Sequence, residues 1–135
     1  MASFSKTSKE RLETCDPRLQ ALFSRVIKIT DCTILVGHRD QVSQNQAFQE
    51  GKSKLKWPES KHNKKPSLAV DASPYPIPKG WERPNFDHFA GVVRAIAWML
   101  DIPIRWGGDW NRNWDTSDQQ FNDLVHFEID DEGQQ

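Results

Sequence analysis

Two histidines and one aspartate in this sequence could together bind a catalytic zinc ion. His62 precedes a short apolar run that ends at Asp71, and His126 lies far downstream in a second apolar segment. Two imidazoles and one carboxylate leave a fourth zinc position open for water, which is the arrangement of a hydrolytic site. The three residues are distant in sequence, so they form a site only if the fold brings them together. Otherwise each histidine is a surface or hydrogen-bonded residue, which is the commoner case.

A hydrolytic zinc site also needs a general base, and two carboxylates flank His126. Glu128 follows His126 by two residues, so in a strand both side chains point to the same face. Asp123 precedes His126 by three residues and qualifies only if Asn122 and Asp123 form a turn that leads into the strand. Strand geometry alone therefore slightly favours Glu128.

Arg39 could supply the positive charge that an oxyanion requires. Its guanidinium can bind a carbonyl oxygen or a carboxylate, and a structural ion pair with the neighbouring Asp40 or another carboxylate is an equally supported role. His38 also follows a predicted strand and either faces the site or is structural. His88 has no partner at a suitable spacing, and we interpret it as a surface or hydrogen-bonded histidine.

Periodic apolar residues predict two core helices. Asp16 and Pro17 are typical of a helix start, because aspartate caps the first turn and proline fits its first position. Apolar residues at helical spacing continue this helix to about Ile29, and a second apolar face marks a helix over residues 86–100. Two shorter and more polar helices are expected over residues 5–12 and 41–51.

Four short apolar segments are typical of strands, and they cover residues 32–37, 68–71, 102–106 and 124–129. The basic residues 52–65, the residues 73–84 with their four prolines and the polar residues 107–120 are expected to be loops, and the tail from residue 130 to be frayed. The sequence therefore predicts one α+β domain over residues 1–135. In it a small, mainly antiparallel sheet packs with two or three helices and carries the zinc site on one face.

Charge and hydropathy exclude several classes of protein. The formal net charge is −1, so no strongly basic surface for nucleic acid is expected. No apolar run is long enough to span a bilayer, and the polar N-terminus lacks the apolar segment of a signal peptide. We therefore expect synthesis in the cytoplasm without membrane insertion, and we expect a monomer. Cys15 and Cys32 form no CxxC motif and are expected to be free thiols.

Several short motifs together resemble the VanY-like zinc peptidases. The motifs are GHR at residues 37–39, SKH at 60–62, AVD at 69–71, RWGGDWN at 105–111 and DLVH at 123–126. This family contains D-alanyl-D-alanine carboxypeptidases and phage endolysins that cut the L-alanyl-D-glutamate bond of peptidoglycan. The sequence is most similar to the endolysin branch, and the similarity covers most of the chain.

The resemblance implies that His62, Asp71 and His126 bind Zn²⁺. It also implies that Asp123, in the first position of DLVH, is the catalytic acid and base, and this reverses the preference from strand geometry. Arg39 would steady the scissile carbonyl and its oxyanion. The sequence differs from the usual pattern in a longer loop between the first histidine and the aspartate, and in an aspartate where many members have a glutamate as base.

Further residues are expected to support the site or contact a peptidoglycan stem peptide. Ser60 matches the serine of the family motif, and Glu128 becomes a probable partner of a zinc ligand. His38 and Trp106 are further candidates. Several lysines around the first ligand could attract an acidic peptide, or could simply belong to a solvated loop. They are Lys54, Lys56, Lys61, Lys64 and Lys65. Aromatic residues that could wall the groove or belong to the core are Trp57, Tyr75, Trp81, Trp106 and Trp110.

A second metal site is suggested by alternating oxygen-bearing side chains. Asp109, Asn111, Asn113 and Asp115 form the D-x-N-x-N-x-D opening of a calcium loop. Trp114 replaces the loop glycine and position twelve is not a glutamate, so a complete EF-hand is excluded. The remaining alternatives are a weak Ca²⁺ site and a polar loop whose side chains satisfy their own turns.

The resemblance implies a bacteriolytic hydrolase that degrades peptidoglycan during phage-induced host cell lysis. Such an endolysin waits in the host cytoplasm until another protein forms a membrane pore, and no separate cell-wall-binding domain is visible. Two alternatives stay open. A D-alanyl-D-alanine carboxypeptidase or dipeptidase would need export, and a non-catalytic module would bind peptidoglycan around structural zinc. Asp123 and Arg39 argue against the module, because structural zinc needs neither.

Overall fold

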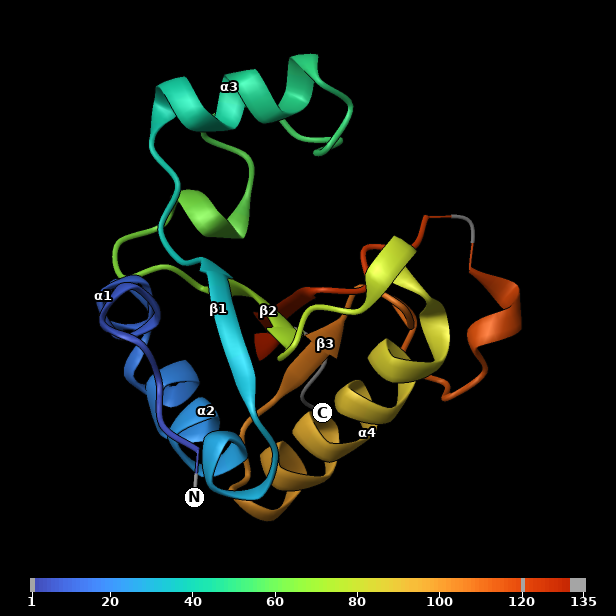
Figure 1. The fold of residues 1–135 in the computed structure, drawn as a ribbon. Helices are drawn as coiled ribbons and strands as arrows, with labels where there is room; N and C mark the ends of the chain where they lie inside the picture. The colour runs from blue at the N-terminus through green and yellow to red at the C-terminus, as the bar shows by residue number, and fades with distance from the viewer. Residues whose placement is uncertain (1, 120, 132–135) are drawn as a thin grey trace.

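The computed structural model describes residues 2–119 and 121–131, and its first helices begin where the sequence provides capping groups (Figure 1). α1 (Lys6–Glu13) begins after Ser5, whose hydroxyl accepts a backbone N–H of the first turn at 3.1 Å. α2 (Pro17–Ile29) begins after Asp16, whose carboxylate accepts a backbone N–H at 2.8 Å. These bonds satisfy N–H groups that have no partner inside the helix. Both predicted starts are confirmed.

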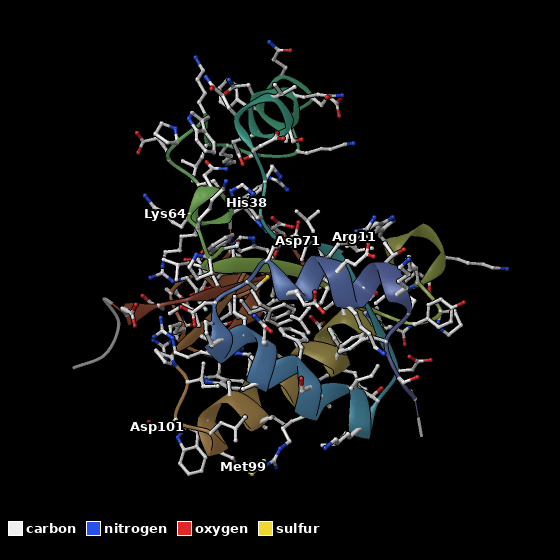
Figure 2. The ribbon with its side chains drawn as sticks, turned by 90° about the vertical axis from the view of Figure 1, so that its left-hand side faces the viewer. Arg11, His38, Lys64, Asp71, Met99 and Asp101 are labelled. Carbon is white, nitrogen blue, oxygen red and sulfur yellow. The ribbon has the colours of Figure 1, made fainter. Side chains whose placement is uncertain are left out.

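Helices α1, α2 and α4 pack with the sheet, and α3 (Gln41–Gln49) stands apart above it (Figure 1). α4 (Arg83–Met99) begins earlier than the predicted residue 86, because a proline occupies its first turn and suits a helix start. A short 3₁₀ helix, η2 (Lys79–Trp81), precedes it within the predicted proline-rich loop. The far end of α4, marked by Met99, lies remote from Asp71 (Figure 2).

Within the described residues, four strands form one antiparallel sheet in the order β1-β2-β4-β3. Asp71 on β2 is the register partner of His126 on β4, so the sheet itself aligns two of the predicted ligands. The predicted second strand ended at Asp71, but β2 continues to Pro74 because its last residues still pair with β1. The predicted α+β class is confirmed. The strands are β1 (Cys32–Val36), β2 (Ala69–Pro74), β3 (Ile104–Trp106) and β4 (His126–Ile129).

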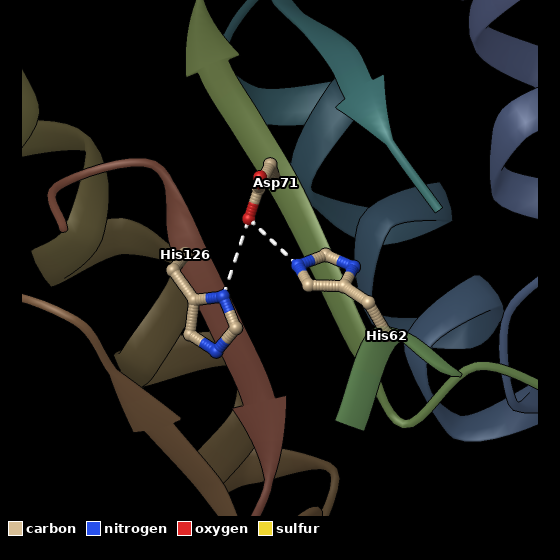
Figure 3. A group of neighbouring side chains, drawn as sticks. All are labelled: His62, Asp71 and His126. Atoms are coloured by element: carbon tan, nitrogen blue, oxygen red, sulfur yellow. Dashed lines mark hydrogen bonds and ion pairs between the residues drawn. The ribbon is translucent and has the colours of Figure 1, made fainter. Parts of the chain in front are cut away.

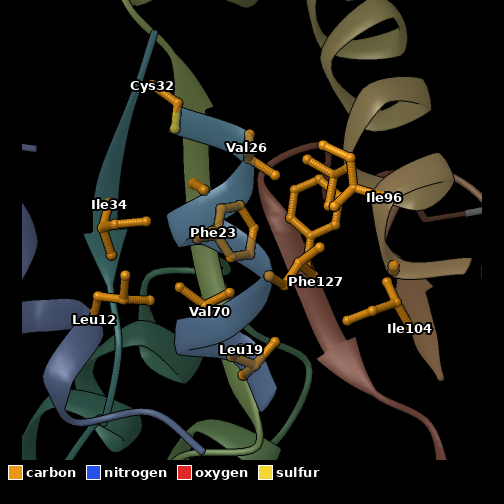
Figure 4. Packing of buried hydrophobic residues seen from close by; sticks show 14 of the residues in the cluster. Leu12, Leu19, Phe23, Val26, Cys32, Ile34, Val70, Ile96, Ile104 and Phe127 are labelled. Atoms are coloured by element: carbon orange, nitrogen blue, oxygen red, sulfur yellow. The ribbon is translucent and has the colours of Figure 1, made fainter. Parts of the chain in front are cut away.

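The hydrophobic core lies between the sheet and helices α2 and α4 (Figure 4). Phe127 of β4 is fully buried and meets Phe23 of α2 and Phe89 of α4 edge to face, with ring centroids 5.8 and 6.1 Å apart. Because side chains alternate along a strand, His126 and Glu128 on either side of Phe127 point to the opposite face of the sheet. Core packing at Phe127 therefore fixes the orientation of both residues.

The segment after β4 begins as a fixed structure. Asp130 is buried and pairs with Arg105 at 2.9 Å and with Arg112 at 3.1 Å. The prediction of a frayed tail is therefore wrong for Asp130, and residues 132–135 lie outside the described residues. Cys15 and Cys32 are buried free thiols, as expected. None of the described helices is long and apolar enough to cross a membrane.

Candidate active site

The three predicted ligands meet in one buried cluster. Asp71 and His126 face each other across β2 and β4, and His62 reaches them from η1 (Lys61–Asn63), a short 3₁₀ helix inside the predicted loop. His62 Nε2 lies 3.1 Å from Asp71 Oδ1, and His126 Nδ1 lies 3.2 Å from the same oxygen (Figure 3). All three side chains are buried. The fold thus brings together residues that are far apart in sequence.

Two of the three spacings between the candidate ligand atoms match those around a tetrahedral zinc ion. Ligand atoms about 2.0–2.1 Å from zinc at tetrahedral angles lie about 3.3 Å from one another. The two contacts with Asp71 match this value, and the three ligand atoms lie within 4.8 Å of one another. His62 Nδ1 lies 2.7 Å from the carbonyl oxygen of Gly37. An N–H at Nδ1 donates to that oxygen, so the Nε2 lone pair points into the cluster, as a metal ligand requires.

The surroundings of His126 favour its protonated form. Burial by itself lowers the pKa of His126, but hydrogen bonds to Asp71 and Glu128 outweigh it and raise the pKa to about 10. The carboxyl of Asp71 is also buried, which opposes ionisation, yet the two histidines hold its pKa well below the usual range. A metal ion must therefore displace a proton from His126 to bind.

Glu128 supports His126 from the side remote from Asp71. Its Oε1 accepts from His126 Nε2 at 2.8 Å, and its Oε2 pairs with Lys61 at 3.2 Å. Lys61 also donates to the backbone oxygen of Ile129. Burial raises the pKa of Glu128, but the contacts with His126 and Lys61 more than offset this and lower it. Glu128 is thus an ionised partner of His126.

Asp123 lies in a turn that leads into β4, which is the condition for it to act as the general base. Its backbone oxygen accepts the N–H of His126 at 3.1 Å, so the chain turns between the two residues. Its Oδ2 lies 4.0 Å from His126 Nδ1, the atom that faces the ligand cluster. Burial, and next the negative charge of Asp71, raise the pKa of Asp123 to about 6. A carboxyl with a pKa near the working pH is suited to proton transfer.

Gly107 and Trp106 hold the Asp123 turn in place. Gly107 accepts the N–H of Asp123 at 2.8 Å and donates to the backbone oxygen of His126 at 2.8 Å. Trp106 is only 2% exposed, and its indole N–H donates to the backbone oxygen of Leu124 at 2.8 Å. Trp106 is therefore a core residue that supports the turn, which is one of the roles that the sequence left open for it.

Replacing Gly107 by alanine is expected to destabilise the protein and displace Asp123. A Cβ atom at Gly107 would lie 2.1 Å from the backbone oxygen of Asp123, so the turn must move. Overpacking of this kind costs about 1–3 kcal/mol of unfolding free energy, which urea denaturation would measure. The control is Gly91→Ala in α4, where an added Cβ meets nothing within 4 Å. Wild-type stability in Gly107→Ala would contradict this account of the turn.

Arg39 lies beside the cluster and is held by more than one contact. Its guanidinium lies 3.6 Å from Asp71 Oδ2 and donates to Gln44 Oε1 at 3.1 Å. The Asp40 carboxylate caps α3, so the ion pair of Arg39 is with another carboxylate, Asp71, and not with its neighbour Asp40. Its neighbour His38 is half-buried and is not among the residues that line the cleft.

Two buried amide side chains, Asn63 and Gln44, connect Arg39 to η1. Neither was predicted from the sequence as a site residue. Asn63 donates to the backbone oxygen of Arg39 at 3.0 Å and to Gln44 Oε1 at 3.1 Å. Ser60 caps η1 by accepting the N–H of His62 at 3.2 Å, and Asn63 completes the capping box. A capping box is usually signalled by a glutamate or glutamine three residues after the serine, so the asparagine here gave no clear signal. Gln44 lies in a polar helix and gave no such signal.

A cleft of about 820 Å³ opens over the cluster. Trp110 forms one wall, with its ring centroid 5.4 Å from that of His126. Trp81 also lines the cleft, whereas Trp57 and Tyr75 are not among the lining residues. Among the predicted lysines, Lys54 and Lys61 line the cleft, and Lys64 is exposed at the edge of the molecule (Figure 2). Lys56 and Lys65 are also not lining residues.

Internal hydrogen bonds hold the loop that was predicted as a calcium site. Asp109 is fully buried, and its Oδ2 accepts from Arg94 and from the backbone N–H of Trp114, each at 2.8 Å. Asn111 and Asn113 donate to Asp118, at 3.2 and 2.7 Å. Asp115 caps a short 3₁₀ helix, η3 (Thr116–Asp118). The first residue of the pattern is thus buried and bound to an arginine.

Comparison with known proteins places the chain in a family. A family model described as phage L-alanyl-D-glutamate peptidase matches residues 1–129. The chain belongs to the phage L-alanyl-D-glutamate peptidase family. The L-alanyl-D-glutamate peptidase of Escherichia phage T5 is 33% identical over 122 residues, which are 86% of this chain and 87% of that protein. The resemblance found in the motifs is thereby confirmed.

A bacterial enzyme has the same fold as this chain. The crystal structure of Serratia marcescens L-Ala D-Glu endopeptidase ChiX matches with a TM-score of 0.74. The match covers 96% of this chain and 91% of that chain, at 22% sequence identity. The region matched by the family model contains the three clustered residues, Asp123 and Arg39. The whole candidate site therefore lies within the shared part of the family.

Proposed function

We propose that the protein is a zinc-dependent endopeptidase that hydrolyses the L-alanyl–D-glutamate bond of peptidoglycan stem peptides. The observation that carries the proposal is the convergence of His62, Asp71 and His126 beside Asp123, in a chain that belongs to this peptidase family. The buried donor set of two imidazoles and one carboxylate fits zinc and leaves room for water and substrate in the cleft.

Zinc held by these three residues would supply Lewis acidity, which activates water and polarises a carbonyl. Asp123 takes a proton from the attacking water and then donates it to the amine of the leaving D-glutamyl residue. Burial raises the pKa of the Asp123 carboxyl, which makes its carboxylate a better proton acceptor than that of an exposed aspartate. Asp123 is therefore the general base and, later, the general acid.

Arg39 stabilises the negative charge that develops on the scissile carbonyl oxygen. Its guanidinium is held by Asp71 and Gln44 before substrate arrives, so little reorganisation is needed during the reaction. Glu128 and Lys61 keep His126 oriented through the ring nitrogen that points away from the cluster. These residues thus position the site, and Asp123 transfers the protons.

Digestion of purified peptidoglycan tests metal-dependent peptidase activity. The zinc-loaded protein is expected to generate new free amino groups without new reducing sugar ends, because it cuts peptide and not glycan bonds. EDTA should abolish the activity, and added zinc should restore it. Activity that persists in EDTA would contradict a zinc peptidase, and new reducing ends would indicate a glycosidase.

We further propose that residues 1–135 act as one monomeric catalytic domain in phage-induced lysis. Made inside the host, the enzyme reaches the wall only after another protein has opened the membrane. Family membership over residues 1–129 supports this setting. Expression in a host cell should cause lysis only when a pore-forming protein is co-expressed, and the inactive Asp123 variant should not lyse cells under the same conditions.

For the loop that begins at Asp109, we propose that any calcium affinity is weak. Binding at Asp109 would have to compete with Arg94, which holds its carboxylate at 2.8 Å. Calorimetric titration of the zinc-loaded protein is expected to give a dissociation constant near or above about 10⁻⁴ M, the range of weak calcium sites. Micromolar affinity that disappears in Asp115→Asn would show that the loop rearranges into a true site.

A further inference from the structure

Among the described residues, five lysine and arginine side chains line the cleft, and one of them has no carboxylate partner. Ion pairs occupy the other four at distances of 2.9 to 3.6 Å. Lys54 has none within 4.0 Å among the described residues. The paired side chains and their partners are Arg39 with Asp71, Lys52 with Glu50, Lys61 with Glu128, and Arg105 with Asp130.

The ammonium group of Lys54 rests on the ring of Phe121, 4.6 Å from its centroid. Both residues line the cleft, and Phe121 precedes Asp123 by two residues. A cation–π contact at an exposed site is weak, so an anion can draw the ammonium away from the ring. Lys54 is thus an available positive charge on the Asp123 side of the cleft.

The leaving side of the proposed substrate carries a matching negative charge. Asp123 donates its proton to the amine of the D-glutamyl residue, so that residue must lie beside Asp123. A glutamyl residue has two carboxyl groups, and only one of them can join the next residue of the peptide. The other stays a free carboxylate unless it is amidated. Beside the Asp123 carboxylate, such an anion is unfavourable without a cation to pair with it.

We propose that Lys54 binds this free carboxylate and thereby selects a D-glutamyl over a D-isoglutaminyl residue on the leaving side. The inference rests on the proposed function and names a specificity determinant of that site. An ammonium-to-carboxylate hydrogen bond is charge-assisted, whereas a neutral carboxamide gives a weaker bond and offers no charge. Lys54 therefore contributes to affinity for the acidic peptide and little to affinity for the amidated one.

The test uses two synthetic stem peptides that differ only in this group, one with the free carboxylate and one with the carboxamide. The zinc-loaded wild type is expected to cleave the acidic peptide with about tenfold higher kcat/KM, a ratio typical of one charge-assisted contact. Lys54→Met should lower kcat/KM for the acidic peptide to about the level of the amidated one, and Lys54→Arg should retain much of the preference.

Lys56→Met is the matched control, because Lys56 is exposed, rests on another phenylalanine, Phe48, and does not line the cleft. It should keep the wild-type preference. An unchanged preference in Lys54→Met, or equal cleavage of both peptides by the wild type, would overturn the assignment of Lys54. Cleavage of neither peptide by the zinc-loaded wild type would instead overturn the proposed function, so the two failures are distinguishable.

Discussion

Asp123→Asn is expected to lose hydrolysis while the protein keeps its zinc and its fold. Asparagine has nearly the same shape but cannot accept a proton from water, and general acid–base catalysis of this kind contributes about 10²–10⁴-fold to a rate. Asp123 is not one of the three clustered ligands, and its backbone contacts with Gly107 and His126 do not involve the carboxylate. Steady-state kinetics, metal analysis and circular dichroism on the same preparation would measure the three properties.

Glu128→Gln is the matched control for this variant, because it neutralises the other carboxylate near His126. Glutamine can still accept a hydrogen bond from His126 through its amide oxygen, so the site survives in a weakened form. Loss of such a supporting contact typically lowers metal affinity about 10–100-fold, and saturating zinc should restore most of the activity. An active Asp123→Asn together with an inactive Glu128→Gln at saturating zinc would reverse the assignment of the base.

His126→Ala is expected to lose zinc and the stability that zinc provides. A ligand that binds only the native state stabilises it by about 4 kcal/mol at a concentration 1,000 times its dissociation constant. Wild-type protein should therefore melt at a clearly higher temperature in zinc than in EDTA, and the variant should show almost no such difference. The variant should also be less stable than wild type in EDTA, because Asp71 and Glu128 lose the imidazole between them.

His88→Ala is the control for a histidine outside the cluster. His88 is exposed on α4, and the sequence predicts no role for it in the site. It should bind zinc like the wild type and show the same zinc-dependent shift in melting temperature. Equal zinc content in His126→Ala and wild type would remove His126 from the ligand set.

Local signals in the sequence were enough to predict most of the fold. The cap at Asp16 and the apolar spacing up to Ile29 predicted α2 with its observed limits. The start of α4 was placed too late, because apolar periodicity reports only the buried face of a helix. The end of β2 was placed too early at Asp71, because pairing with β1 is a long-range property that the short apolar run does not encode.

The residues of the candidate site could be named from the sequence, but the contacts that support them could not. Strand alternation placed Glu128 on the same face as His126, but only the fold shows that Glu128 binds the ring nitrogen that points away from Asp71. The position of Asp123 depended on a turn, and the bonds of Gly107 that hold this turn link residues far apart in sequence. For Trp106 the sequence left both the core and the cleft open, because a tryptophan can serve either, and only the fold shows that it is buried.

Mass spectrometry of peptidoglycan digested by the zinc-loaded protein tests the central claim most directly, with an EDTA-treated sample as the control. We expect new stem-peptide fragments that begin with a D-glutamyl or isoglutaminyl residue, which identifies cleavage after L-alanine. These fragments should be absent in EDTA and in the Asp123→Asn digest. Release of terminal D-alanine alone would contradict the endopeptidase and indicate a carboxypeptidase, and an intact stem peptide with zinc bound would indicate a binding module.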